Sequence, residues 1–238
     1  WLIMRKYENR LATINENLEN MVNQRSRALL KTRDAVIFGL AKLTESRDTE
    51  TGDHLERIRA FVEVVAEEMV RRERDLAMST DQIRTLGLAS SLHDVGKVGV
   101  PDAVLRKPGR LTDDERRLIE QHPVIGGETL LAIMRKLGED DFLANACQIT
   151  FAHHERWDGT GYPFQLQEED IPWSDRLVEL ADVYDALTSR RVYKPPLSHE
   201  QARDIIVSES GSRFDPAVVE AFLAREQEFR TIVEKGLP

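Results

Sequence analysis

Apolar side chains recur along the chain at intervals of three and four residues, the spacing of one face of an α-helix. The first stretch is the most regular, because its intervals run 3, 4, 3, 4, 3 and asparagine and glutamate fill many of the positions between. Its apolar positions are Met4, Tyr7, Leu11, Ile14, Leu18 and Met21. This pattern is the seam of a coiled coil, so we expect a parallel homodimer through this helix. The alternative is an amphipathic helix that lies on its own domain.

Helical spacing continues through the rest of the chain. Three signals mark helix starts, two capping boxes and one aspartate before a proline, at Thr112 with Glu115, Ser198 with Gln201, and Asp215 with Pro216. Helices are predicted to end at His93 and Asp94 before Gly96, at His122 before Pro123, and at His153 with His154. We find no Asn-Gly hairpin turn and no sustained period-2 run, so the prediction is all-α, with about eight helices and two long loops, 97–111 and 155–172.

Composition narrows the function classes. The chain has 238 residues and a formal net charge of −9, and this acidic balance argues against a protein that coats polymeric nucleic acid through its phosphates. No run of about 18 apolar residues exists, so we expect no membrane span. The single cysteine, Cys147, rules out an internal disulfide and fits a reducing cytosol, so a cytoplasmic location is expected.

The histidines are the candidate chemistry. We take five of the six as candidates, each within two residues of an acid or of another histidine at predicted helix positions, namely His54, His93, His122, His153 and His154. We expect the sixth, His199 at a helix start, to be a surface residue. Imidazole with carboxylate suits divalent Fe, Mn, Co, Ni or Zn, and the lack of paired thiolates excludes a structural zinc finger.

Two motifs resemble a known family. Residues 93–97 read His-Asp-Val-Gly-Lys, which resembles the signature of HD-domain phosphohydrolases. Residues 153–163 read His-His-Glu-Arg-Trp-Asp-Gly-Thr-Gly-Tyr-Pro, which resembles the long signature of the HD-GYP subfamily. The resemblance spans 35–225 and implies a core of five helices with extra C-terminal helices. It also implies a metal-dependent phosphodiesterase that hydrolyses cyclic di-GMP to pGpG, GMP or both. Ser212 and Arg213 depart from the usual pattern, away from the implied metals.

Carried over position by position, the resemblance implies two or three divalent transition-metal ions, most readily Fe or Mn, with Ni, Co or Zn as alternatives. The implied ligands of one ion are His54, His93, Asp94 and Asp182. Asp94 bridges to a second ion held by His122, His153 and His154, and Glu50 matches the acid that takes a third. Asp94 and Lys97 are the implied catalytic residues. The positions that face the substrate are Lys97, Gly161, Tyr162, Arg191 and Lys194.

Two of these roles have ordinary alternatives. Glu50 also reads as an exposed helix acid near Arg47, and the basic residues Arg191 and Lys194 also read as a solvated helix end that the helix dipole favours. The position-by-position match favours the functional interpretation in each case.

The expected organisation is an N-terminal signalling helix over 1–34, a catalytic domain over 35–225 and a helical tail over 226–238. Because the chain begins with Trp1 and no signal-peptide pattern follows, we expect a sensory or receiver domain upstream. Two alternatives stay open, a phosphodiesterase for another ring such as cyclic GMP-AMP, and a module that binds cyclic di-GMP or a diguanylate cyclase (GGDEF) domain without turnover.

Overall fold

The computed structural model describes residues 1–47, 53–72, 76–138, 140–189 and 195–235. The chain divides into two compact units, Trp1–Gly39 and Leu40–Pro238. The first helix, α1 (Leu2–Glu45), supplies all of the first unit and, with its last turns, part of the second. The expected division into 1–34, 35–225 and 226–238 is not tested by this clustering and stays a prediction.

Within the first unit, α1 is a continuous helix whose apolar stripe is exposed. The exposed fraction is 67% for Met4, 59% for Leu11 and 50% for Leu18. Nothing among residues 1–39 covers these side chains, so the predicted helix is confirmed and the predicted pairing remains to be tested.

The second unit is built from helices, as predicted from the sequence. Among its described residues the only β-type pairing is an isolated bridge between Ser210 and Phe214. The elements after α1 are α2 (His54–Arg72), α3 (Thr80–Ser90), the 3₁₀ helix η1 (Val95–Gly99), α4 (Asp102–Leu105), α5 (Asp113–Ile119), α6 (His122–Leu137), α7 (Asp141–Ala152), the 3₁₀ helix η2 (Glu168–Asp170), α8 (Trp173–Thr188), α9 (His199–Ser208), α10 (Pro216–Ala224) and α11 (Glu226–Lys235). None of the described helices is long and apolar enough to cross a membrane.

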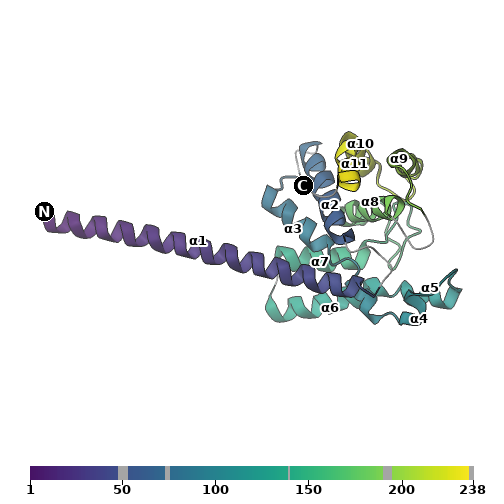
Figure 1. The fold of residues 1–238 in the computed structure, drawn as a ribbon, viewed down its shortest axis with the longest axis horizontal. Coiled ribbons are helices and arrows are strands. Elements are labelled where there is room, and N and C mark those ends of the chain that lie inside the picture. The colour runs from purple at the N-terminus through teal and green to yellow at the C-terminus, as the bar shows by residue number, and fades with distance from the viewer. Residues whose placement is uncertain (48–52, 73–75, 139, 190–194, 236–238) are drawn as a thin grey trace. The chain divides into compact units, whose positions relative to one another are not determined.

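Five helices form the centre of this unit (Figure 1). Helix α2 packs against α3 and α8, while α7 packs against α3, α6 and α8. Their facing sides are apolar, and Ile58, Phe61 and Leu180 are fully buried. The C-terminal helices α10 and α11 cover α2, where Phe61 stacks on Phe229 with ring centroids 4.5 Å apart. The predicted core of five helices with extra C-terminal helices is therefore confirmed.

The capping signals gave the right helix starts. Thr112 and Ser198 are the N-cap residues of α5 and α9, and each forms a capping box with the residue three positions later. The side chain of Asp215 accepts a hydrogen bond from the backbone N–H of Ala217, and Pro216 opens α10. These local signals are reliable because each satisfies backbone N–H groups that the helix itself leaves unpaired.

Several predicted boundaries are wrong. His122 does not end a helix but begins α6, because Pro123 is tolerated in a first helical turn, where no backbone N–H is needed. The predicted loop 97–111 begins inside η1 and contains α4, and the loop 155–172 contains η2. Such one-turn elements add to the eight expected helices, and they are too short to carry a periodic pattern.

The expectation for His199 is also wrong. Its side chain is only 7% exposed, and the Tyr184 hydroxyl lies 2.8 Å from its Nδ1. Tyr184 belongs to the aromatic cluster beneath α10 and α11, so a polar partner for its hydroxyl must also be buried. His199 supplies that partner.

Candidate metal centre

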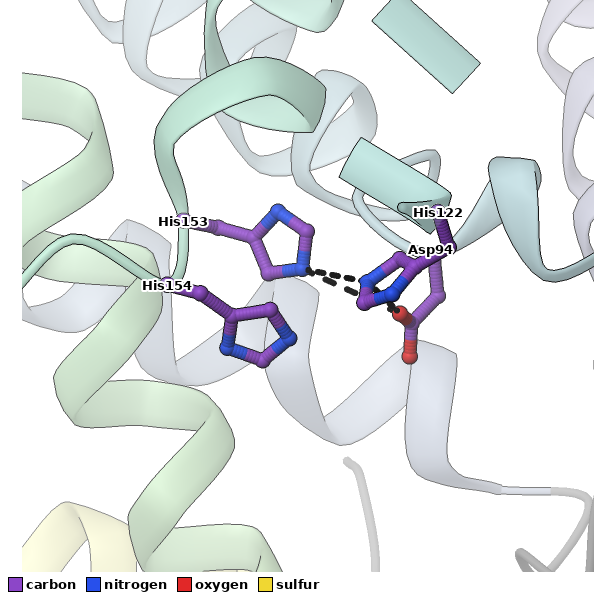
Figure 2. A group of neighbouring side chains, drawn as sticks. All are labelled: Asp94, His122, His153 and His154. Carbon is purple, nitrogen blue, oxygen red and sulfur yellow. Dashed lines mark hydrogen bonds and ion pairs between the residues drawn. The ribbon is translucent and has the colours of Figure 1, made fainter. Parts of the chain in front are cut away.

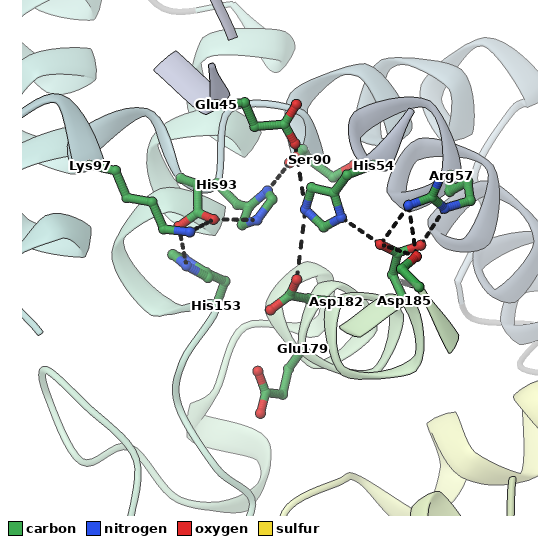
Figure 3. A network of polar contacts seen from close by, with 12 residues as sticks. Glu45, His54, Arg57, Ser90, His93, Lys97, His153, Glu179, Asp182 and Asp185 are labelled. Carbon is green, nitrogen blue, oxygen red and sulfur yellow. Dashed lines mark hydrogen bonds and ion pairs between the residues drawn. The ribbon is translucent and has the colours of Figure 1, made fainter. Parts of the chain in front are cut away.

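Seven side chains from five separate segments of the chain meet at the centre of the helical unit. Within each group, one ligand atom from every residue lies within 4.8 Å of the others. One group comprises His54, His93 and Asp182, and the other comprises Asp94, His122, His153 and His154 (Figures 2 and 3). All seven are among the metal ligands predicted from the sequence, so the fold brings together every predicted ligand that it describes.

Asp94 lies between the two groups and faces both. Its Oδ2 is 3.1 Å from Nε2 of His93. Its Oδ1 is 3.1 Å from Nε2 of His122 and 3.8 Å from Nε2 of His153. One carboxylate thus presents a separate oxygen to each group, which is the arrangement that a bridging ligand requires.

The glycine of the His-Asp-Val-Gly-Lys motif allows this approach. A Cβ atom added to Gly96 would stand 1.9 Å from the carbonyl oxygen of His122 and 2.6 Å from the backbone nitrogen of Gly126. Only glycine lets η1 pack this closely on the first turn of α6. The contact places Asp94 at the start of η1 beside His122.

Four of the five histidines direct Nε2 into the site because Nδ1 is held from behind. The Nδ1 atoms of His93, His122 and His153 lie 2.8, 2.7 and 3.0 Å from the backbone carbonyl oxygens of Ser90, Ile119 and Ile149. Nδ1 of His54 lies 2.7 Å from Oδ2 of Asp185. An acceptor at Nδ1 favours the tautomer whose Nε2 lone pair is available to a cation.

Burial and neighbouring charge shape the proton affinities of the site. Burial lowers the pKa of His153 to about 4. It also lowers the pKa of His154, aided by the neighbouring imidazoles. For Asp94, burial acts to raise the pKa, but the Lys97 ammonium at 2.7 Å and the surrounding imidazoles outweigh it and hold the pKa well below its usual range. These shifts favour neutral imidazoles at His153 and His154 and a charged carboxylate at Asp94, the protonation states that bind divalent cations. For His93, burial acts to lower the pKa, but the Asp94 carboxylate outweighs it and raises the pKa.

The second motif forms a folded loop beside His154. The Glu155 carboxylate accepts hydrogen bonds from the backbone N–H groups of Phe164 and Leu166, at 2.7 and 3.0 Å. The ring of Tyr162 lies 4.7 Å from that of His154, measured between centroids. A Cβ atom on Gly161 would stand 2.4 Å from the backbone nitrogen of Arg156, so this glycine is needed for packing of the loop.

The structure describes one of the remaining predicted residues and leaves three outside the described ranges. Lys97, on η1, forms the ion pair with Asp94 and lies at the edge of the site. Glu50, Arg191 and Lys194 fall outside the described residues, so their predicted roles remain predictions.

Sequence reasoning assigned no role to three buried carboxylates near the site. Glu45, in the last turn of α1, places Oε1 3.8 Å from Nε2 of His54. Asp185 holds His54 from behind and is itself bound by Arg57, whose Nε lies 2.5 Å from Oδ1. Glu179 is 2% exposed and pairs with Arg213. A usable signal was the regular spacing of three acids, at 179, 182 and 185, on α8.

The chain matches known proteins over most of its length. A family model described as HD domain covers residues 16–218. A cyclic di-GMP phosphodiesterase of Vibrio cholerae is 54% identical over 202 residues, which are 84% of this chain and 41% of that protein. One of Thermotoga maritima is 41% identical over 196 residues, 82% of this chain and 50% of that protein. A 3'3'-cGAMP-specific phosphodiesterase of Vibrio cholerae is 38% identical over 217 residues, 91% of this chain and 38% of that protein.

The chain thus spans at most half the length of these relatives. Among solved structures, a cyclic GMP-AMP specific phosphodiesterase of V. cholerae matches with a TM-score of 0.56 at 20% identity. The match covers 83% of this chain and 50% of that chain. At this identity the likeness shows the fold alone, and it agrees with the helical core described above.

Proposed function

Because the chain belongs to the HD domain family, we propose that it is the catalytic part of a metal-dependent phosphodiesterase that hydrolyses cyclic di-GMP. The observation that carries the proposal is Asp94, whose two carboxylate oxygens face two separate groups of histidines. The relatives named cyclic di-GMP phosphodiesterases support the choice of substrate.

The residues fit divalent transition-metal ions. Nε2 of His93 and Oδ1 of Asp94 are buried and make no hydrogen bond within the described part of the chain, a costly state that a cation relieves. Imidazole nitrogens with carboxylate oxygens suit Fe or Mn, and also Ni, Co or Zn. Bound there, such ions would supply the Lewis acidity that opening a phosphodiester bond needs.

We assign the ligands as follows. His54, His93 and Asp182 hold one ion together with Oδ2 of Asp94. Asp94 would also hold the second ion, together with His122, His153 and His154. Support comes from the described geometry, in which each set of donors combines residues from three separate segments, with ligand atoms within 4.8 Å of one another in each group.

A third ion through Glu50 is a finer proposal, and this residue lies outside the described ones. A carboxylate four residues before His54 would add one ligand beside the first ion. Glu50→Gln is then expected to lower the metal content by one ion per chain and to make pGpG accumulate instead of GMP. Unchanged metal content with an unchanged ratio of products would leave Glu50 without a role at the metal centre.

The chain's own basic and aromatic groups would bind the dinucleotide. Lys97 stands beside Asp94 and would offset negative charge on a phosphoryl oxygen. Tyr162, packed against His154, offers a ring on which a guanine can stack. Gly161, Arg191 and Lys194 complete the proposed substrate contacts, the last two as partners of the second phosphate.

We extend the proposal to assembly. The exposed stripe of α1 pairs in parallel with that of a second copy, which would bury side chains such as Leu11 and Leu18. A diguanylate cyclase (GGDEF) domain is a further candidate partner, for which the test is co-purification with the intact protein.

One experiment tests the proposed activity most directly. The protein is purified without air, its metal content is measured, and cyclic di-GMP and cyclic GMP-AMP are then offered separately. We expect bound divalent metal and faster turnover of cyclic di-GMP, with pGpG and GMP as products. Faster turnover of the mixed ring would assign the activity named for the 38% identical relative instead, and binding of cyclic di-GMP without turnover would favour a sensory module.

A further inference from the structure

Helix α8 presents three carboxylates to the candidate metal centre at intervals of three residues, Glu179, Asp182 and Asp185 (Figure 3). On an α-helix this spacing keeps side chains along one side, with a gradual rotation. Asp182 stands in the middle as a candidate ligand. The two outer acids are buried, each at 2% exposure, so both are held inside the unit at a cost in desolvation.

Each of the two outer acids is paired with an arginine from another segment of the chain. Nε of Arg57, on α2, lies 2.5 Å from Oδ1 of Asp185. Nε of Arg213, in the segment between α9 and α10, lies 2.5 Å from Oε1 of Glu179. Arg57 also donates from its terminal nitrogen to Oδ2 of Asp185, at 3.0 Å, so it binds both oxygens of that acid. In each pair the carboxylate oxygen opposite the Nε contact faces a histidine of the site.

The second oxygens face the histidines at opposite ends of the metal centre. Oδ2 of Asp185 lies 2.7 Å from Nδ1 of His54. Oε2 of Glu179 lies 4.0 Å from Nδ1 of His154. This oxygen is buried and has no hydrogen-bond partner among the described residues, and no hydrogen bond to Nδ1 of His154 is found among them either.

His154 is thereby the exception among the five histidines. The other four have an acceptor within 3.0 Å of Nδ1. In Figure 2 the Nε2 side of the His154 ring faces the cluster and Nδ1 faces away. An imidazole that gives Nε2 to a cation must carry its proton on Nδ1, and a partly buried N–H needs an acceptor.

We propose that Glu179 is a positioning residue for His154, accepting a hydrogen bond from Nδ1–H and so fixing the ring with Nε2 toward the ion, while Arg213 directs the carboxylate. The inference rests on the metal centre proposed above and not on the identity of the substrate. At 4.0 Å the two atoms are beyond hydrogen-bond distance, so the contact needs a small movement of the glutamate side chain onto the ring, which the metal-free protein can also make. The positive charge that a bound cation places on the imidazole strengthens that contact.

The first test measures binding of Mn²⁺ alone to metal-free protein at pH 8, above the pKa of about 7 that burial gives Glu179 against the opposing effect of Arg213. We expect Glu179→Ala to weaken the binding of one ion about 10- to 100-fold. Glu179→Gln keeps an acceptor oxygen without the charge and should lose less. The matched control is Glu68→Gln, which removes another 2% exposed carboxylate bound to arginines on α2 and should leave Mn²⁺ binding unchanged.

A second measurement reads the proton directly. Long-range ¹H–¹⁵N spectra of the metal-free protein report which ring nitrogen of His154 carries hydrogen, with the signals assigned through His154→Gln. The proposal predicts the Nδ1–H tautomer in the parent and a shift toward Nε2–H in Glu179→Ala. A purely structural role of Glu179 would leave the tautomer unchanged.

If Glu179→Ala fails to fold because Arg213 is left unpaired, the double variant Glu179→Met with Arg213→Met removes both charges and keeps apolar volume, a replacement that buried ion pairs often tolerate. It should fold and still bind one Mn²⁺ more weakly. Parent-like Mn²⁺ binding in this variant, or equal losses in the Glu68→Gln control, would overturn the role of Glu179. A parent chain that binds no metal would instead overturn the proposed metal centre.

Discussion

The two units depart from the ordinary pattern of burial in opposite directions. In Trp1–Gly39 the apolar stripe lies outside, with Leu11 at 59% exposure, whereas in Leu40–Pro238 the polar histidine His93 is fully buried. Both arrangements are costly, because exposed apolar area loses the hydrophobic contribution and a buried polar atom loses its water. Each cost would be removed by a binding partner that covers the apolar area or contacts the buried polar atom. The exposed stripe of the first unit is what the proposed pairing with a second copy would cover, and the buried donors of the second are what the proposed cations would satisfy.

The largest expected effect comes from removing the residue between the two histidine groups. Asp94→Ala should abolish hydrolysis, by more than about 1,000-fold, and strip bound metal, since both groups lose a carboxylate oxygen. Circular dichroism should show the helix content largely intact. Asp114→Ala, at a carboxylate with 88% exposure, is the matched control. Full metal content and parent-like turnover in Asp94→Ala would refute the assignment of the site.

Replacing Lys97 tests whether its ammonium group in the second unit acts on the substrate or on the candidate metal ligand Asp94. Lys97→Met should lower kcat about 100-fold while the metal content stays unchanged, if its ammonium acts on a phosphoryl oxygen. Lys136→Met, on the exposed side of α6, is the control. Loss of metal together with activity would show instead that Lys97 serves the centre by holding Asp94, from which it is 2.7 Å away.

A third test concerns a buried acid that faces no histidine. Burial raises the pKa of Asp175 to about 7, with Ser174 and Gln148 opposing it through hydrogen bonds. A carboxyl whose pKa is higher in the folded than in the unfolded chain contributes stability that is complete below about pH 4 and is lost as the pH rises through 7. Asp175→Asn should remove this loss, so its advantage over the parent in free energy of unfolding should grow by roughly 2–3 kcal/mol between pH 5 and pH 8.

Urea unfolding of both metal-free proteins at several pH values measures that difference. A difference between the two chains that is independent of pH would show that Asp175 is ionised in the folded state.

The smallest effect on turnover is expected at the exposed stripe of the first unit. Replacing Leu11 and Leu18 by glutamate places like charges along the seam and should convert a dimer to a monomer that still hydrolyses substrate. Light scattering after size-exclusion chromatography measures the mass. The control replaces Glu16 and Glu19, which lie off the seam, by glutamine. If the parent chain is already monomeric, the pairing of the stripes is wrong.

The two regions also differ in how far the sequence predicts them. The apolar stripe of α1 can be predicted from the sequence, because helical periodicity is a property of a single element. At the metal centre, the motifs identify His93, Asp94, His153 and His154, whereas the role of His122 as the first residue of α6 required the structure. His199 was misjudged because its partner, Tyr184, comes from another helix.

The sequence by itself determined the helical class and the capped helix starts, since each depends on side chains within a few residues of one another. The candidate ligands came from the family resemblance that its motifs carry. Only the tertiary structure decided that Asp94 turns one oxygen to each histidine group. It also decided that Asp185 and Glu179 stand behind His54 and His154. These relations join side chains on different helices, and the packing of α2, α7 and α8, which no local pattern encodes, sets the distances between them.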